Sequence, residues 1–479
     1  MTKRRIKRLY QIVLPVAVRE RIAEFRHPRR TVLRTVIEDY YAALEVVALQ
    51  MASSDASAKS LGQLHDAFRR YRVRSSRISD EWWIGFVSAA CTPDPEGLKL
   101  QHQLALEVDS GQFGKLFHWE LFHVAGLAVR CGLLVLGFRL RERALSVALS
   151  YDPSSRKREG WNMVAKLAAL LEIQDFNEFR SQLPALNKSF HEERLRLQHL
   201  YGLVCIEDTS NEYKTLAQLP KDNSGFSDDV YGKTVAIVGP AMTDSADGRS
   251  IDGHDFVARC KYTEAGIGVD AAVKGLRCDA SYLDSDQVTH VCESEQLNWP
   301  PEIKWAVCMQ LSDENRRNNA VRLATRLNVE DRNGIAQAQS PGVRSLRIRA
   351  LTTINSALFS GELNAIPNVI LDIMRFEPAR IKVFHTDLML TVSRTRGYYP
   401  DEWDLNAAEK IKTSTLRGAA RAFDFVTQYR LLHRLWKQSL ICGDGRFDEV
   451  MTLGEGEYIR RMQEIYGNSG RIDVRGVEA

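Results

Sequence analysis

The sequence predicts an α/β protein with a mainly parallel, Rossmann-like sheet, preceded by an α-helical domain. Up to about residue 225, apolar residues recur at helical spacing, whereas short β-type runs begin only after a polar, turn-rich stretch at 218–232. Helical patterns, such as the one at 363–376, lie between several of these runs, and this alternation is typical of parallel sheets. We therefore expect a helical domain at 1–225, a linker around 218–232, an α/β domain at 226–468 and a tail at 469–479.

The predicted strands are short and rich in apolar residues. They lie at 234–239, 256–260, 280–284, 305–309, 351–355 and 381–387. In open parallel sheets, ligands bind beyond the carboxyl ends of the strands. The strand tips at Gly239, Arg259, Asp284, His385 and Asp387 are therefore the first places to look for a site.

The helical half contains one strongly apolar segment, at 124–138. It carries Arg130 and is shorter than the roughly 20 apolar residues that span a bilayer. We expect it to form one buried helix. The eight cysteines form no C-x-x-C pair, which indicates reduced thiols in a cytoplasmic protein and neither a disulfide framework nor a zinc site.

Charge is unevenly distributed along the chain. The net charge is only +4, but the first 34 residues hold eleven Lys or Arg against Glu20 and Glu24. Such a segment is either a solvated basic helix or a peripheral contact with anionic lipid on the inner face of the membrane. We expect no nucleic-acid partner.

The first strand ends in Gly239, where backbone N–H groups can approach an anion. No Gly-Lys-Ser/Thr follows, so this is not a Walker loop, and G-x-G-x-x-G is absent too. A strand followed by glycine is by itself a weak predictor of nucleotide binding.

Three successive stretches, "VAIVGPA", "SIDGHDFVARCKY" and "GLRCDASYLD", together resemble the long sialylmotif of the glycosyltransferase family 29 sialyltransferases. Pro240, Cys260 and Asp284 stand where that family tends to have Asn. The matching residues are Val235, Gly239, Ile251, Asp252, Asp255, Val257, Arg259, Gly275, Asp279, Tyr282 and Leu283. The resemblance implies that the nucleotide is bound near Gly239, Pro240, Ala241, Arg259 and Asp284.

The stretch 359–390 resembles the short sialylmotif of the same family. Ser360 and Gly361 would open a helix whose N-terminus suits phosphate. The following strand ends in His385, Thr386 and Asp387. The segment 396–403 is similar to the aromatic third motif and implies a nucleotide contact from Tyr398. The segments 423–436 and 453–467 are similar to the last motif and to the closing helix of bacterial members.

The last motif differs at its catalytic position. Phe423 stands where the family has its catalytic His, and Asp424 is kept. Sugar transfer needs a base for the proton of the acceptor hydroxyl. His385, Asp387 and Asp424 are the candidate catalytic bases, and the alternative is a protein that binds without catalysis.

Asp284 and Asp286 form an Asp-x-Asp triplet after a strand, a pattern that can hold Mg or Mn on a nucleotide diphosphate. A CMP-sugar has a monophosphate leaving group and needs no such bridge. We therefore expect no cofactor, with Arg259 or helix-end amides carrying the phosphate charge. If the donor is a nucleotide diphosphate sugar, the two aspartates become the metal ligands.

The resemblance implies transfer of sialic acid or a related ulosonic acid from a CMP-sugar donor to a glycan or lipid-linked glycan, in a bacterial cytoplasm. One alternative is an inactive nucleotide- or glycan-binding protein of the same fold. A second is another strand-glycine enzyme, such as a pyrophosphokinase or a methyltransferase. A third makes the helical half a partner-binding module.

Overall fold

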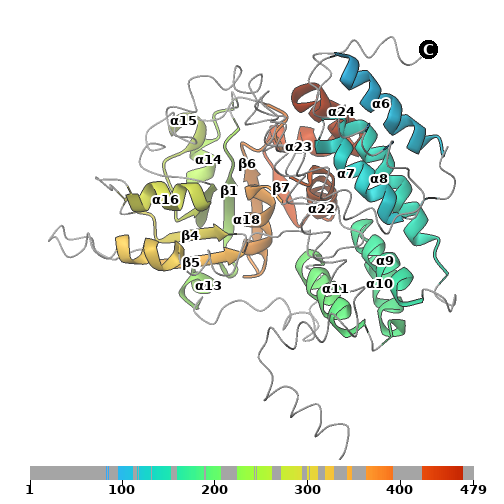
Figure 1. Ribbon diagram of the computed structural model, residues 1–479. Coiled ribbons are helices and arrows are strands. Elements are labelled where there is room, and N and C mark those ends of the chain that lie inside the picture. The colour runs from blue at the N-terminus through green and yellow to red at the C-terminus, as the bar shows by residue number, and fades with distance from the viewer. Residues whose placement is uncertain are drawn as a thin grey trace, which may run out of the picture. The chain divides into compact units, whose positions relative to one another are not determined.

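We describe the protein from a computed structural model (Figure 1). It describes residues 82, 85, 95–111, 116, 118–130, 132–152, 159–187, 190–205, 224–241, 243, 245–260, 271–293, 299–300, 302–310, 319–327, 342–347, 363–391 and 423–467. The basic segment at 1–34, the predicted strand at 351–355, Ser360, Gly361 and Tyr398 lie outside these residues.

The chain divides into two compact units, 1–116 and 117–479. The first contains α6 (Pro95–Asp109). The second contains both a group of helices and the sheet, so the boundary that we predicted at 225/226 does not coincide with the division between these units.

The sheet of the second unit has seven strands, all parallel, in the order β5-β4-β3-β2-β1-β6-β7. This confirms the predicted α/β, Rossmann-like architecture. The strands are β1 (Thr234–Val238), β2 (Phe256–Cys260), β3 (Ala280–Leu283), β4 (Trp305–Gln310), β5 (Gly342–Arg347), β6 (Arg380–Phe384) and β7 (Ile441–Gly443). Five of them lie where the sequence predicts strands, and β5 and β7 were not predicted.

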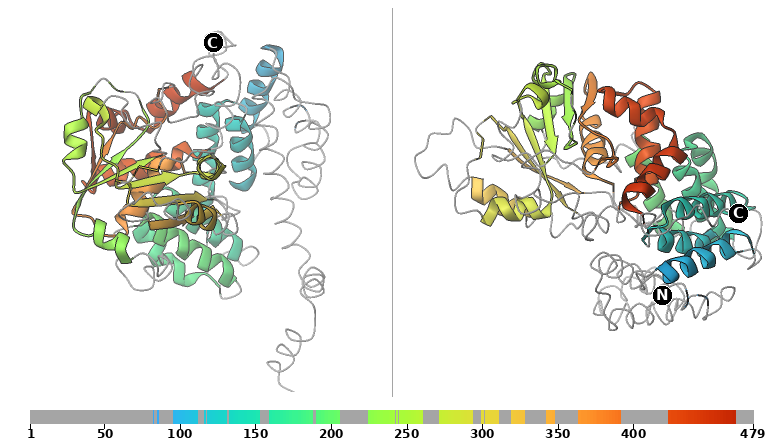
Figure 2. Two further views of the ribbon diagram at one scale, coloured as in Figure 1. Left: turned by 90° about the vertical axis from the view of Figure 1, so that its left-hand side faces the viewer. Right: turned by 90° about the horizontal axis from the view of Figure 1, so that it is seen from above.

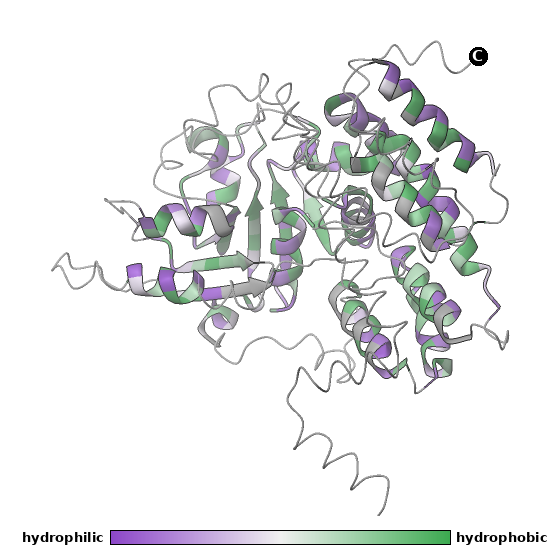
Figure 3. Ribbon diagram, viewed as in Figure 1, coloured by the Kyte–Doolittle hydropathy of each residue, from purple (hydrophilic) through white to green (hydrophobic). Residues whose placement is uncertain are grey.

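Helices flank the sheet and continue beyond its β7 edge. The helix α13 (Ser224–Val230) comes just before β1. The helices that lie between or after the strands are α14 (Gly248–Asp252), α15 (Ala271–Lys274), α16 (Ser285–Glu293), α18 (Ala365–Met374), α22 (Phe425–Lys437), α23 (Gly445–Thr452) and α24 (Glu455–Tyr466). In Figure 3 the central strands are largely hydrophobic, whereas the helices carry hydrophilic and hydrophobic residues. This is the pattern of a sheet buried on both faces.

A second group of helices precedes the sheet in the chain. It comprises α7 (His118–Arg130), α8 (Leu134–Leu149), α9 (Glu159–Glu172), α10 (Phe176–Gln182), the 3-10 turn η1 (Leu183–Ala185) and α11 (His191–Val204). The views agree that α22 and α24 lie between this group and the β7 edge of the sheet (Figures 1 and 2). The two parts of the second unit therefore meet through these C-terminal helices.

The apolar segment at 124–138 forms two helices and not the one that we expected. Gly132 has a φ of +82°, a left-handed conformation that ends α7 and allows α8 to begin at Leu134. In the described part of the chain, no helix is both long and apolar enough to cross a bilayer.

Part of the predicted linker is also folded. Residues 224–230 form α13, and Phe226 on this helix is buried against the rings of Phe256, Trp305 and Phe376. One aromatic residue in a polar run is a weak signal, which explains why the sequence reads as a linker there.

Candidate functional site

The sheet has a topological switch point at β1. From β1 the chain moves outward through β2 to β5, and it then returns to pair β6 with the other side of β1. Ligands of open α/β sheets bind beyond the carboxyl ends of the two strands at such a point. Here those ends are Gly239 to Ala241 after β1 and His385 to Asp387 after β6. We call these residues, with Thr243, Lys274 and Asp444, the strand-tip site.

The two strand tips are bonded to each other. The N–H of Gly239 donates to Phe384 O at 2.8 Å, and the N–H of Ala241 donates to His385 O at 2.9 Å. A Cβ at position 239 would lie 2.5 Å from the His385 carbonyl oxygen and closer still to Thr386 Oγ1. Glycine is therefore required where these loops meet, and two of the amides that we expected at an anion are used between the loops.

Lys274 brings positive charge to the β1 tip. This buried side chain donates from Nζ to Ala241 O at 3.0 Å and to Gly239 O at 3.3 Å. Arg259 lies behind it: its guanidinium donates to Lys274 O at 2.6 Å and to Arg277 O at 2.8 Å. Arg259, which we predicted to bind phosphate, thus holds the segment that carries Lys274.

The aspartates of the sialylmotif-like stretches support the loops. Asp252 accepts from the N–H groups of Leu276 and Arg277, and Gly275 beside it has a φ of +68°. Asp255 accepts from the N–H and hydroxyl of Thr234. Asp279 accepts from the N–H of Val257.

Tyr282, another residue of the motif, lies on β3 and is buried. Its hydroxyl donates to Asp372 Oδ2 at 2.8 Å, and the same carboxylate accepts from Arg344 at 3.0 Å. Asp372 lies on α18, so this contact fixes α18 against the sheet.

The imidazole of His385 is enclosed in the strand-tip site. Nδ1 lies 2.6 Å from Thr243 Oγ1, and Nε2 lies 3.0 Å from Val273 O. The backbone N–H of His385 donates to Asp444 Oδ2 at 2.7 Å, at a φ of +49°. Burial, followed by the nearby Lys274 charge, lowers the pKa of His385 to about 4, so the ring is neutral at pH 7.

Asp387 is a strand-tip residue with one carboxylate oxygen that is not hydrogen-bonded to any described residue. The residue is 3% exposed, and Oδ1 accepts from the N–H of Met389 at 3.0 Å. Oδ2 is buried and has no hydrogen-bond partner among the residues that the structure describes. Leu388 and Met389, which follow it, have φ values of +48° and +74°, which are costly for residues other than glycine.

Two tyrosines of α24 hold this strained turn. Tyr458 donates to Leu388 O and Tyr466 donates to Met389 O, each at 2.9 Å. Gln428 links Tyr458 to the start of α18, because it lies 3.4 Å from the Tyr458 hydroxyl and accepts from Asn364 N–H. The N-terminus of α18 therefore lies near the β6 tip. The helix is capped by Asn364 and begins at Ala365, not at Ser360 and Gly361 as we expected.

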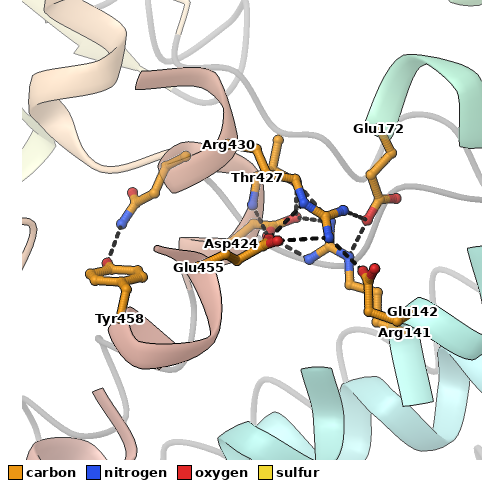
Figure 4. Close-up of polar contacts among 9 residues, drawn as sticks. Arg141, Glu142, Glu172, Asp424, Thr427, Arg430, Glu455 and Tyr458 are labelled. Carbon is orange, nitrogen blue, oxygen red and sulfur yellow. Dashed lines mark hydrogen bonds and ion pairs between the residues drawn. The ribbon is translucent and has the colours of Figure 1, made fainter. Parts of the chain in front are cut away.

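Asp424 lies in a buried ion-pair network (Figure 4). Its carboxylate accepts from Arg141 Nη1 at 2.7 Å and Nη2 at 3.1 Å, and also from the N–H and hydroxyl of Thr427. Asp424 is thus the N-cap of α22 and the partner of an arginine from α8. These contacts weigh against a role for Asp424 as a free base.

The network around Arg141 has more carboxylates than guanidinium groups. Glu172 on α9 also pairs with Arg141, and Arg430 on α22 pairs with Glu142 and Glu455. Oε2 of Glu172 is buried and has no hydrogen-bond partner in the described residues. Burial raises the pKa of Glu172 to about 7, although Arg141 and Arg430 act in the opposite direction.

This raised pKa predicts a pH-dependent stability. Folded Glu172 keeps its proton up to about pH 7, whereas the unfolded group ionises near pH 4.5. The free energy of unfolding therefore has its full value, as far as Glu172 is concerned, below pH 4.5 and falls as the pH rises to 7. The loss is roughly 3 kcal/mol, from about 1.4 kcal/mol per pKa unit. Urea unfolding of wild type and Glu172→Gln at pH 5, 6, 7 and 8 checks this. We expect the difference between them to change over this range, and a constant difference would contradict the prediction.

Asp284 caps a helix. Its Oδ1 accepts from Gln287 N–H at 3.0 Å at the start of α16. Among the described residues there is no group of three or more His, Cys, Asp or Glu side chains that could hold a metal ion. The side chain of Asp286 lies outside the description.

Sequence reasoning missed Thr243, Lys274 and Asp444. Asp444 had the clearest signal, because an Asp directly after a short apolar run and before "GRFDEVM" is typical of a helix N-cap, which it is in α23. Lys274 is a single Lys in a mixed stretch and Thr243 lies in a polar loop, so only the fold shows their positions.

No family model matches the chain, and no curated protein matches it significantly. The resemblance to the sialyltransferases therefore contributes to a proposal about function and does not establish a family.

Proposed function

We propose that the protein transfers an acidic sugar, sialic acid or a related ulosonic acid, from a CMP-sugar to a glycan acceptor at the strand-tip site. The observation that carries this proposal is the meeting of the β1 and β6 tips at the switch point of a parallel sheet, because the two sialylmotif-like halves contain these two tips. This is where nucleotides bind in such sheets.

The charges around the site fit a nucleotide monophosphate. The Lys274 ammonium lies on the β1 tip, and the N-terminus of α18, a site of partial positive charge, lies near the β6 tip. Both favour a phosphate without a metal ion. Asp284 caps α16, and this weighs against the alternative of a metal-bridged nucleotide diphosphate.

Asp387 is the proposed base. As the acceptor hydroxyl oxygen bonds to the anomeric carbon, the bond from that carbon to the CMP phosphate breaks, CMP leaves with the electron pair, and Asp387 Oδ2 takes the hydroxyl proton. Oδ2 is buried and has no hydrogen-bond partner among the described residues, so its lone pairs can accept this proton. His385 has both ring nitrogens engaged and does not offer a free lone pair.

Thermal denaturation with cytidine, uridine, guanosine and adenosine monophosphates tests the proposal. We expect CMP to raise the melting temperature most, since a ligand at a hundredfold excess over its Kd stabilises a protein by about 2.7 kcal/mol. Gly239→Ala, which would push the two tips apart, should lose this shift relative to its own ligand-free value. Stabilisation by ATP or S-adenosylmethionine, and not by CMP, would instead indicate another strand-glycine enzyme.

An inactive nucleotide-binding protein is the second candidate, because Phe423 cannot accept a proton. Hydrolysis of CMP-sialic acid separates the two candidates. CMP binding without any turnover would favour the inactive protein.

A further inference from the structure

A chain of hydrogen bonds leads from the buried His385 to the surface. His385 Nδ1 lies 2.6 Å from Thr243 Oγ1, Thr243 Oγ1 lies 3.1 Å from Ser245 Oγ, and Ser245 Oγ lies 2.5 Å from Asp247 Oδ2. His385 is fully buried, Thr243 is half-buried and Ser245 is exposed. The four groups thus cross from the interior of the strand-tip site to solvent.

The proton positions in this chain follow from the chemistry of its ends. A carbonyl oxygen can only accept, so His385 Nε2 must carry a proton toward Val273 O. Nδ1 is then the acceptor of a neutral ring. At the other end, Asp247 is the N-cap of α14, yet its side chain makes no capping bond and instead contacts Ser245.

In the ligand-free protein the two hydroxyl protons serve the two ends of the chain. Thr243 donates to His385 Nδ1 and Ser245 donates to Asp247 Oδ2, so the 3.1 Å contact between the two hydroxyl oxygens holds no proton. A proton that arrives from solvent at Asp247 can fill this contact when both hydroxyl groups turn inward. The same heavy-atom positions therefore serve two proton arrangements.

We propose that Asp247, Ser245, Thr243 and His385 form a proton relay. In the inward direction, the Asp247 carboxylate takes a proton from solvent and gives it to Ser245, Ser245 gives its own proton to Thr243, and Thr243 gives its own to His385 Nδ1. The result is an Asp247 carboxylate and a His385 imidazolium, with both hydroxyl groups intact. The relay lets the strand-tip site gain or lose a proton while His385 stays buried. Its proton transfers do not depend on which nucleotide or sugar binds at the site.

The charges around His385 set the resting state of the relay. Lys274 on α15 and Arg259 on β2 disfavour the imidazolium, whereas Asp247 favours it, and the Asp444 carboxylate accepts from the His385 backbone N–H. Burial is the largest effect and lowers the pKa of His385 to about 4. The neutral ring is therefore the resting form, and a bound anion would favour uptake of a proton from solvent by His385 through the relay.

The test is the coupling between the two ends of the relay in the ligand-free protein. NMR of ring-labelled histidine, with the His385 signal assigned by its loss in His385→Gln, gives the His385 pKa. Asp247→Ala should lower this pKa by removing the carboxylate. In a Ser245→Ala background, where the exposed middle link is cut, the same substitution should have less than half that effect.

Thr243→Val and Thr243→Ser form a matched pair at the inner link. The valine variant should reduce the effect of Asp247→Ala as Ser245→Ala does, whereas the serine variant should keep it. If Asp247→Ala changes the His385 pKa equally in all backgrounds, Asp247 acts only through space, and the relay is overturned. No change of this pKa in the wild-type background would also overturn it. Because no ligand is used, failure of the CMP-sugar proposal would leave this result interpretable.

Discussion

Replacing Asp387 by Asn is expected to lower turnover of CMP-sialic acid roughly 10²- to 10⁴-fold, the usual contribution of a general base. Asn has nearly the same shape and can still accept from the N–H of Met389, so the strained turn should keep its conformation. The substitution removes only the proton acceptor that Oδ2 provides. CMP binding, measured by calorimetry, should therefore change little while the rate of transfer falls.

Asp175→Asn is the matched control for Asp387→Asn. Asp175 is the N-cap of α10, where its side chain accepts from Glu178 N–H, and Asn caps helices about as well. This variant should keep wild-type turnover. Full activity in Asp387→Asn would remove Asp387 from the mechanism, and a simultaneous loss of CMP binding would assign it to the support of the turn.

The sequence predicts the centre of the sheet well and its edges poorly. The strand β2 has the predicted bounds, because five consecutive buried residues are enclosed between turn residues. The edge strands β5 and β7 escaped prediction for different reasons. β5 reads "GVRSLR", with polar residues among the apolar ones, and β7 has only three residues, too few for a periodic signal.

The candidate site was predictable in location but not in detail. Strand tips with His385 and Asp387 can be found from sequence, since the carboxyl ends of parallel strands meet at one edge of a sheet. Whether a carboxylate there is paired with another side chain depends on residues that are distant in the sequence. Asp387 and Asp424 look alike in the sequence, yet Asp424 meets Arg141, 283 residues away in the chain. No local pattern contains that pair.

That pair underlies the largest stability effect that we expect. Arg141 is buried between Asp424 and Glu172 and joins α8 and α9 to α22, all within the second unit (Figure 4). Arg141→Met keeps most of the side-chain volume but leaves the buried Asp424 carboxylate without its cation, whereas Glu172 still lies 3.6 Å from Arg430. Breaking a buried ion pair from one side costs about 3–5 kcal/mol. We therefore expect a clearly lower urea midpoint for Arg141→Met at pH 7.

A control variant and a compensating variant decide whether the unpaired charge causes the loss of stability. Arg460 on α24 is exposed and pairs with Glu457 and Glu464, so Arg460→Met should leave the midpoint unchanged, because exposed ion pairs contribute little. Adding Asp424→Asn to Arg141→Met removes the uncompensated charge and should recover part of the loss. A midpoint unaffected by Arg141→Met would mean that the carboxylates find protons or water without cost. The Arg141 charge would then contribute little to holding α8 and α9 against α22.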